Sequence, residues 1–168
     1  MTSIIKLKTS CTHDLYHRLL SAGCFLAFLS VSATAFSQTI QDAVKALWNE
    51  QPQKAKNILL HVVSKTPADA EACFRLGNIY YSLGKKDSAA FYFQKGIKPE
   101  DKVNYNFAGL GKLALDDKNE SKAQEYLNKL TANGKSRDPK AYIFAGEAYF
   151  NSSLKDSSRA LPLLVKAT

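Results

Sequence analysis

The chain has 168 residues, of which 45% are hydrophobic and 23% are charged, and its formal net charge is +8. This composition is typical of a globular chain of about one ordinary domain and excludes an intrinsically disordered one. The basic residues are scattered over several predicted helices instead of forming a stripe, so we predict no nucleic-acid partner.

The first predicted element is an N-terminal leader at residues 1–37. A segment with three basic residues precedes an apolar run at 19–36, which ends in small residues. This order is typical of a secretory signal peptide. We therefore predict cleavage between Ser37 and Gln38, and an exported protein in the periplasm or at the outer membrane.

Two alternatives for the leader stay open. The apolar run is about long enough to cross a bilayer, so an uncleaved leader would leave the protein anchored in the membrane by its N-terminus. The residues from Leu20 to Cys24 also resemble the lipobox of bacterial lipoproteins, in which the cysteine is acylated. Most of the apolar run follows Cys24 instead of preceding it, which argues against lipidation.

After the leader, the sequence repeats itself with a spacing of 34 residues. Within 70–103, two apolar patterns of helical period flank a turn at Gly84. Positions of matching character recur in the neighbouring stretches: Leu76-Gly77 with Leu110-Gly111, Ala89 with Ala55 and Ala123, and Phe93 with Leu59 and Leu127. A period of 34 indicates a helix-turn-helix repeat.

The repeat frame predicts one domain at 38–168. It divides into four units, at about 36–69, 70–103, 104–137 and 138–168. The helices expected in the first three units are 38–49 and 52–65, 70–83 and 86–98, and 103–116 and 119–131. The fourth unit begins at Pro139, and its second helix follows an enlarged turn at 151–156. Gly84 is expected to adopt the left-handed conformation that ends a helix.

The stretch 70–103 resembles a tetratricopeptide repeat. The resemblance rests on these residues: Cys73, Leu76, Gly77, Tyr80, Gly84, Ala89, Phe93 and Gly96. It implies an all-α fold, in which about three and a half to four units form a right-handed superhelical array, or α-solenoid. It also implies a non-catalytic scaffold, with no cofactor, that binds a peptide or protein segment in its concave groove. The partner's identity is not encoded in the pattern.

The first helix of each unit lines the concave face of such an array. The candidate peptide-binding residues are those that the repeat pattern does not use for packing: Phe74, Asn78, Tyr81, Tyr105, Lys112, Glu147 and Phe150. Further positions of the same kind are Val44, Trp48, Ala108, Leu115 and Ile143. Aromatic rings supply contact area, and an amide can bond a peptide backbone in both directions. The alternative is that these aromatic residues pack between helices.

Some tetratricopeptide-repeat proteins hold the carboxylate of a chaperone C-terminus in a clamp of basic and amide side chains. Phe74 and Ala108 occupy places where that clamp needs basic residues, so we do not expect it here. Catalysis is not expected either, because His61 is the single histidine after the leader, and Cys73 occupies a packing position. No grouping of histidine or cysteine predicts a metal site.

The last predicted helix carries an apolar run at 161–165. Repeat arrays usually end in a helix with a polar outer face. We therefore expect the natural chain to continue, or this end to dock onto a partner or a second copy. The alternative function is accordingly an N-terminal spacer module of a larger envelope protein, or a chain that associates with itself through this helix.

Overall fold

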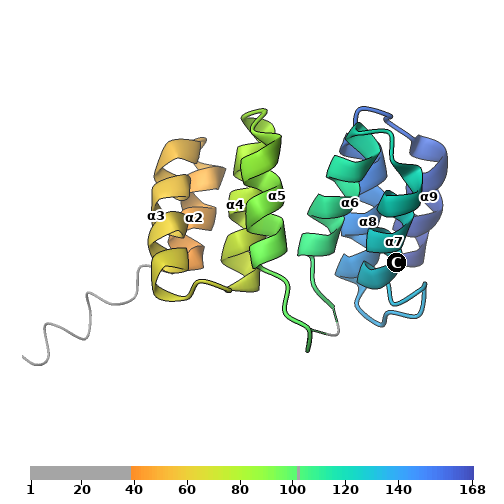
Figure 1. The fold of residues 1–168 in the computed structure, drawn as a ribbon, viewed down its shortest axis with the longest axis horizontal. Coiled ribbons are helices and arrows are strands. Elements are labelled where there is room, and N and C mark those ends of the chain that lie inside the picture. The colour runs from red at the N-terminus through yellow and green to blue at the C-terminus, as the bar shows by residue number, and fades with distance from the viewer. Residues whose placement is uncertain (1–38, 102) are drawn as a thin grey trace, which may run out of the picture. The chain divides into compact units, whose positions relative to one another are not determined.

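In the computed structural model, residues 39–101 and 103–168 are described, and every element among them is an α-helix (Figure 1). The helices are α2 (Ile40–Trp48), α3 (Pro52–Lys65), α4 (Ala70–Ser82), α5 (Lys86–Lys95), α6 (Asn106–Asp116), α7 (Glu120–Leu130), α8 (Pro139–Asn151) and α9 (Ser157–Lys166). The predicted all-α repeat fold is confirmed. The predicted leader lies outside the described residues.

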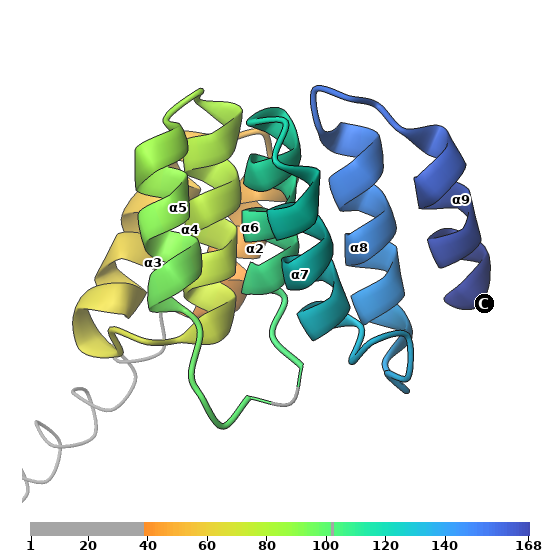
Figure 2. The same cartoon turned by 45° about the vertical axis from the view of Figure 1, so that its right-hand side comes forward.

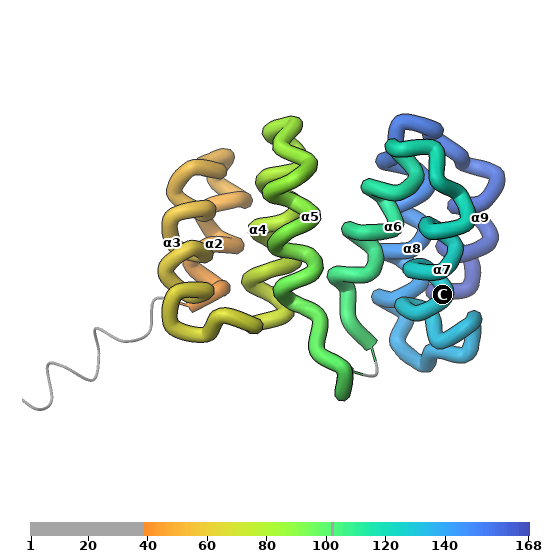
Figure 3. The backbone as a smooth tube through the Cα atoms, viewed as in Figure 1, coloured from red at the N-terminus to blue at the C-terminus, as the bar shows by residue number. Residues whose placement is uncertain are grey.

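The eight described helices form four antiparallel hairpins in two layers. The inner layer holds α2, α4, α6 and α8, and the outer layer holds α3, α5, α7 and α9 (Figures 2 and 3). Contacts run from α4 to α6 and from α6 to α8, whereas successive outer helices in the described part of the chain make no comparable contacts. The inner helices α4, α6 and α8 therefore lie closer together than the outer helices do, and this is the face on which a groove forms.

A small residue on each inner helix sets the spacing within a hairpin. A Cβ atom added to Gly77 would overlap the ring of Phe93, and one added to Gly111 would lie 2.8 Å from Leu127. Gly146 approaches Leu164 in the same way, at 2.8 Å. Such contacts leave no room for a larger side chain, which is the physical reason for the 34-residue recurrence. They also fix which residues of the hairpins are equivalent.

The connection between α5 and α6 is longer than the sequence predicts. We expected helices at 86–98 and 103–116, but α5 ends at Lys95 and α6 begins at Asn106. The Asn104 side chain donates to the Gly96 carbonyl at 2.7 Å and accepts from the Asn106 amide at 2.9 Å. These side-chain bonds replace helical ones, which is how asparagine ends or delays a helix.

Two features of the described residues bear on the remaining expectations. Gly84 has a φ of 70°, so the predicted left-handed turn is confirmed. Leu161 and Val165 of α9 are exposed; that this end docks onto another molecule stays a prediction. Among the helices of residues 39–101 and 103–168, none is both long and apolar enough to cross a membrane.

Candidate functional site

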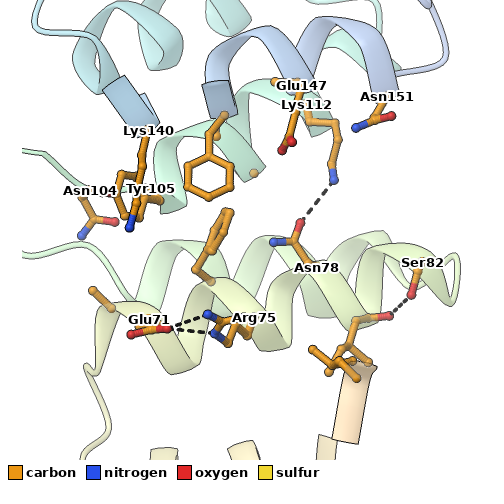
Figure 4. A pocket seen from close by; sticks show the side chains of 18 of the residues that line it. Glu71, Arg75, Asn78, Ser82, Asn104, Tyr105, Lys112, Lys140, Glu147 and Asn151 are labelled. Atoms are coloured by element: carbon orange, nitrogen blue, oxygen red, sulfur yellow. Dashed lines mark hydrogen bonds and ion pairs between the residues drawn. The ribbon is translucent and has the colours of Figure 1, made fainter. Parts of the chain in front are cut away.

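A cavity of about 740 Å³ opens on the inner layer, and we call it the inner groove (Figure 4). Side chains of α4, α6 and α8 form most of its lining, and Leu47 and Pro52 contribute from the first hairpin. Five of the seven residues predicted to bind peptide line it: Phe74, Asn78, Tyr105, Lys112 and Glu147. Of the other two, Tyr81 lies beside the groove and Phe150 is exposed outside its lining.

Of the five further positions that the sequence analysis named, only one lines the inner groove. Ala108 lines the inner groove, whereas Leu115 is fully buried in the core. Val44, Trp48 and Ile143 are not among the lining residues. Whether any of these residues touches a ligand stays a prediction.

An aromatic cluster forms one part of the groove wall. The ring of Phe74 lies 6.2 Å from that of Tyr105 and 5.1 Å from that of Phe144, centroid to centroid. The rings of Tyr105 and Phe144 are 4.9 Å apart, and Phe93 supports Phe74 from the core at 6.2 Å. The three wall residues are each half-buried. They form a firm apolar surface that remains open to a ligand.

A polar pair forms another part of the wall. The Lys112 ammonium donates to Asn78 Oδ1 at 3.3 Å, and the two side chains point toward one another in Figure 4. The same ammonium lies 3.8 Å from the ring centroid of Tyr81, a cation–π contact. Burial lowers the pKa of Lys112, and the nearby carboxylates Asp116 and Glu147 partly oppose that shift.

Tyr81 connects three hairpins beside the groove. Its hydroxyl donates to Asp116 Oδ2 at 2.7 Å, and Asp116 Oδ1 accepts the Ser153 amide at 2.7 Å. The Asp116 side chain is 7% exposed. Burial, followed by the bond to Asp116, raises the pKa of the Tyr81 hydroxyl. Tyr81, predicted to contact peptide, is thus engaged in joining α4 to α6 and to the turn after α8.

Tyr105 makes a second bond of this kind between hairpins. Its hydroxyl donates to Asp138 Oδ2 at 2.6 Å, while Asp138 Oδ1 accepts the Lys140 amide and caps α8. Burial and this bond to Asp138 raise the pKa of Tyr105 to about 12. The aromatic cluster is therefore held in place through the N-terminus of α8.

The raised pKa of Tyr105 predicts a loss of stability at alkaline pH. Between pH 10 and 12 the folded protein keeps a proton that the unfolded chain releases, so stability falls as pH rises through this window. We expect wild type to lose more stability than Tyr105→Phe between about pH 8 and about pH 11, by on the order of 1 kcal/mol after solvent screening. Urea unfolding at the two pH values measures the difference. Equal losses in both proteins would contradict it.

Residues 70–98 match the family described as tetratricopeptide repeat. Two solved crystal structures of a protein named MamA are similar to this chain. One has a TM-score of 0.52 at 22% identity, covering 82% of this chain and 81% of that one. The other has a TM-score of 0.51 at 22% identity, covering 80% and 74%. Comparison with curated proteins finds no match.

The second hairpin, α4 and α5, is the stretch that matches a tetratricopeptide repeat. At 22% identity the likeness to MamA shows a shared fold, which extends well beyond the one repeat that matches the family directly. Tetratricopeptide-repeat proteins are in general non-catalytic scaffolds for protein–protein interaction. Within residues 39–101 and 103–168, no three histidine, cysteine, aspartate or glutamate side chains are grouped to hold a metal ion. Cys73 is buried, and that burial raises the pKa of its thiol.

The inner groove also contains residues that the sequence analysis missed. They are the charged and polar positions Glu71, Arg75, Lys140 and Asn151, and the aromatic Phe144. Glu71 and Arg75 form an ion pair at 2.7 Å along α4. The missed residues lie on the same helical stripes as the predicted Asn78 and Glu147. On α4 the stripe is Glu71, Arg75, Asn78 and Ser82, and its equivalent on α8 is Lys140, Phe144, Glu147 and Asn151.

Proposed function

We propose that this protein captures an extended segment of a partner protein in the inner groove. The observation that supports it most strongly is the aromatic cluster and the Lys112–Asn78 pair lining one cavity of about 740 Å³. A cavity of this size accommodates a few side chains of a peptide, since ligand pockets span roughly 300–1,000 Å³. The proposed mechanism is binding of the segment, without a catalytic step and without a cofactor.

Each part of the wall has a distinct task in this proposal. Phe74, Tyr105 and Phe144 offer a surface for one large apolar side chain of the peptide, and buried aromatic contacts dominate binding energy. Asn78 can donate to and accept from a peptide backbone. Lys112 supplies a donor that already lacks much of its water, so a hydrogen bond to a peptide carbonyl costs less desolvation there than at the surface.

We further propose that the protein acts after export, in the periplasm or at the outer membrane. The support is the sequence at 1–37, with its basic segment, apolar run and small residues before Gln38. Intact-mass analysis of the protein from a native envelope fraction should give a chain beginning at Gln38. A chain recovered only from the cytosol, with the leader intact, would contradict the proposal.

Truncation of a wall aromatic should weaken peptide binding. A peptide first selected from a random display library on wild-type protein provides the ligand. We expect Phe144→Ala to lower its affinity about thirtyfold, the effect of losing a hot spot worth about 2 kcal/mol. Lys112→Met should weaken binding by a smaller factor, because one hydrogen bond contributes less than the contact area of an aromatic ring.

The matched control is Phe91→Ala. Phe91 is 55% exposed and belongs to the outer helix α5, so its removal should leave the affinity unchanged. Fluorescence anisotropy gives the dissociation constants, and circular dichroism melts establish that each variant is folded. Peptides that bind Phe144→Ala as tightly as wild type would contradict the assignment of the groove.

A further inference from the structure

The loop between α7 and α8 carries the only Asn-Gly pair of the sequence, Asn133-Gly134. Ala132, Asn133 and Gly134 have φ angles of 48°, 54° and 80°, so three consecutive residues lie in the left-handed region. Glycine enters that region without steric cost, and asparagine enters it more readily than most residues. The pair therefore forms a tight, non-helical turn, and it takes no part in lining the inner groove.

The side chain of Asn133 is exposed, and the hydrogen bonds among the described residues leave it unheld. It lines a second cavity of about 520 Å³, together with Asn128 of α7 and Phe107 of α6. The main-chain N–H of Asn133 donates to the Asn128 carbonyl at 2.8 Å. This bond fixes the main chain of the turn but leaves the carboxamide free to rotate toward the following peptide bond.

The main-chain nitrogen of Gly134 is accessible to that carboxamide. Its N–H donates to Thr131 Oγ1 at 3.3 Å, which is longer than a well-formed N–H···O bond. Inside a helix, the same N–H would be held by the carbonyl four residues earlier. Gly134 also lacks a Cβ that would hinder the approach. A nitrogen that is weakly held and unshielded can reach the side-chain carbon of the preceding residue.

We propose that Asn133 is a site of spontaneous self-modification, in which its carboxamide cyclises onto the Gly134 nitrogen and loses ammonia. A bond forms between the Gly134 nitrogen and Asn133 Cγ, the Cγ–Nδ2 bond breaks, and the proton of the Gly134 nitrogen leaves with Nδ2 as ammonia. Water then opens the resulting succinimide at either of its two carbonyls. One opening gives aspartate, and the other gives isoaspartate, in which the main chain runs through the former side chain.

The other described asparagines lack one or more of these conditions. None of them is followed by glycine. Asn104 and Asn106 are buried, and the Asn119 side chain accepts the Lys122 amide at 3.1 Å. The residue after Asn151 is a serine, whose Cβ shields the main-chain nitrogen. Within the described part of the chain, the exposed carboxamide and the unshielded nitrogen therefore come together at Asn133.

The modification has a structural consequence because Gly134 holds the last helix. The Lys166 ammonium, near the end of α9, donates to the Gly134 carbonyl at 2.6 Å. Isoaspartate inserts an additional carbon into the main chain before Gly134, so it displaces this carbonyl and removes the bond. Aspartate leaves the main chain unchanged and preserves the bond. Isoaspartate should therefore loosen the end of α9, whether or not the inner groove captures a peptide.

Peptide mass spectrometry of the aged protein tests the chemical step. The full-length chain is kept in warm neutral buffer, and electron-transfer fragmentation separates aspartate from isoaspartate at each asparagine. We expect Asn133 to convert at least about tenfold faster than Asn119 or Asn151, because a following side chain raises the barrier to ring closure. Isoaspartate should exceed aspartate. Asn133→Gln, which would need a larger ring, should stay unmodified at this position.

Hydrogen exchange of α9 tests the consequence. The last turn of α9 should lose protection in aged wild type but not in Asn133→Gln aged for the same time. Fresh Lys166→Met, which lacks the bond to Gly134, should show the same loss without ageing. Conversion of Asn133 no faster than that of Asn119, or conversion to aspartate alone, would overturn the self-modification. Unchanged exchange in α9 after isoaspartate has formed would overturn its link to the last helix.

Discussion

Replacing Gly109 with alanine is expected to destabilise the array by about 1–3 kcal/mol, although alanine is the better helix former. Gly109 of α6 and Gly77 of α4 both lie against the Phe93 ring, and a Cβ at either position would overlap it. Phe93 is fully buried, so its ring cannot move away freely. The third hairpin therefore approaches the second only because both glycines lack a side chain.

A double-mutant cycle separates this steric effect from helix propensity. Phe93→Ala alone should cost about 3–5 kcal/mol through the lost burial and the cavity. In that background Gly109→Ala should become neutral or stabilising by up to about 1 kcal/mol, because the overlap is gone and propensity remains. Chemical denaturation of the four proteins measures the coupling, and additive effects would contradict the steric account.

Gly111→Ala is the matched control on the same helix. Its Cβ would meet the end of the Leu127 side chain at 2.8 Å, and a leucine can change its rotamer more easily than a buried ring can shift. We expect a smaller cost than at Gly109. A larger one would show that the packing of Phe93 does not determine the distance between the second and third hairpins.

Asp116→Ala is expected to cost about 2–4 kcal/mol, because two donors lose a buried charged acceptor. The Tyr81 hydroxyl and the Ser153 amide both bond to this carboxylate, so α4, α6 and the turn after α8 depend on it. Asp116→Asn should cost less, since its remaining carbonyl oxygen can still accept one bond.

The neighbouring Asp117 provides the control for Asp116. Its side chain is 65% exposed and pairs with Lys86 at 3.2 Å on the surface. Asp117→Ala should therefore cost less than about 1 kcal/mol. Thermal unfolding of both variants makes the comparison, and equal costs would show that the buried bonds of Asp116 contribute little. Tyr81→Phe should reproduce part of the Asp116 effect.

The repeat fold could be predicted from the sequence because the close approach of the two helices in each hairpin restricts the size of the residues between them, and these residues recur at a fixed spacing. In every hairpin the positions equivalent to Gly77 and Ala89 must hold small residues, and the position equivalent to Phe93 must hold a large one. This requirement comes from packing and does not depend on what the protein binds. The connection at residues 96–105 was predicted less well. There the helix ends depend on bonds from the Asn104 side chain to two other residues, and periodicity does not report such bonds.

Only part of the groove lining was predicted, because periodicity alone does not show which neighbour each face of a helix contacts. Helical spacing identified Phe74 and Asn78 as groove residues. It does not distinguish the residues of an inner helix that face the next inner helix from those that face the groove. Tyr81 and Phe150 are of the former kind, one residue away from Ser82 and Asn151, which line the cavity. Phe144 was missed because it follows Ile143, and only the packing of α6 against α8 distinguishes the two.

Photo-cross-linking of a selected peptide tests the central proposal most directly. A peptide carrying benzophenone in place of its apolar anchor is bound to the wild-type chain and irradiated, and the labelled residues are identified by mass spectrometry. The proposal predicts labels on residues that line the inner groove, within 71–82, 105–112 and 140–151. Labels confined to the outer helices α3, α5 and α7 would contradict it.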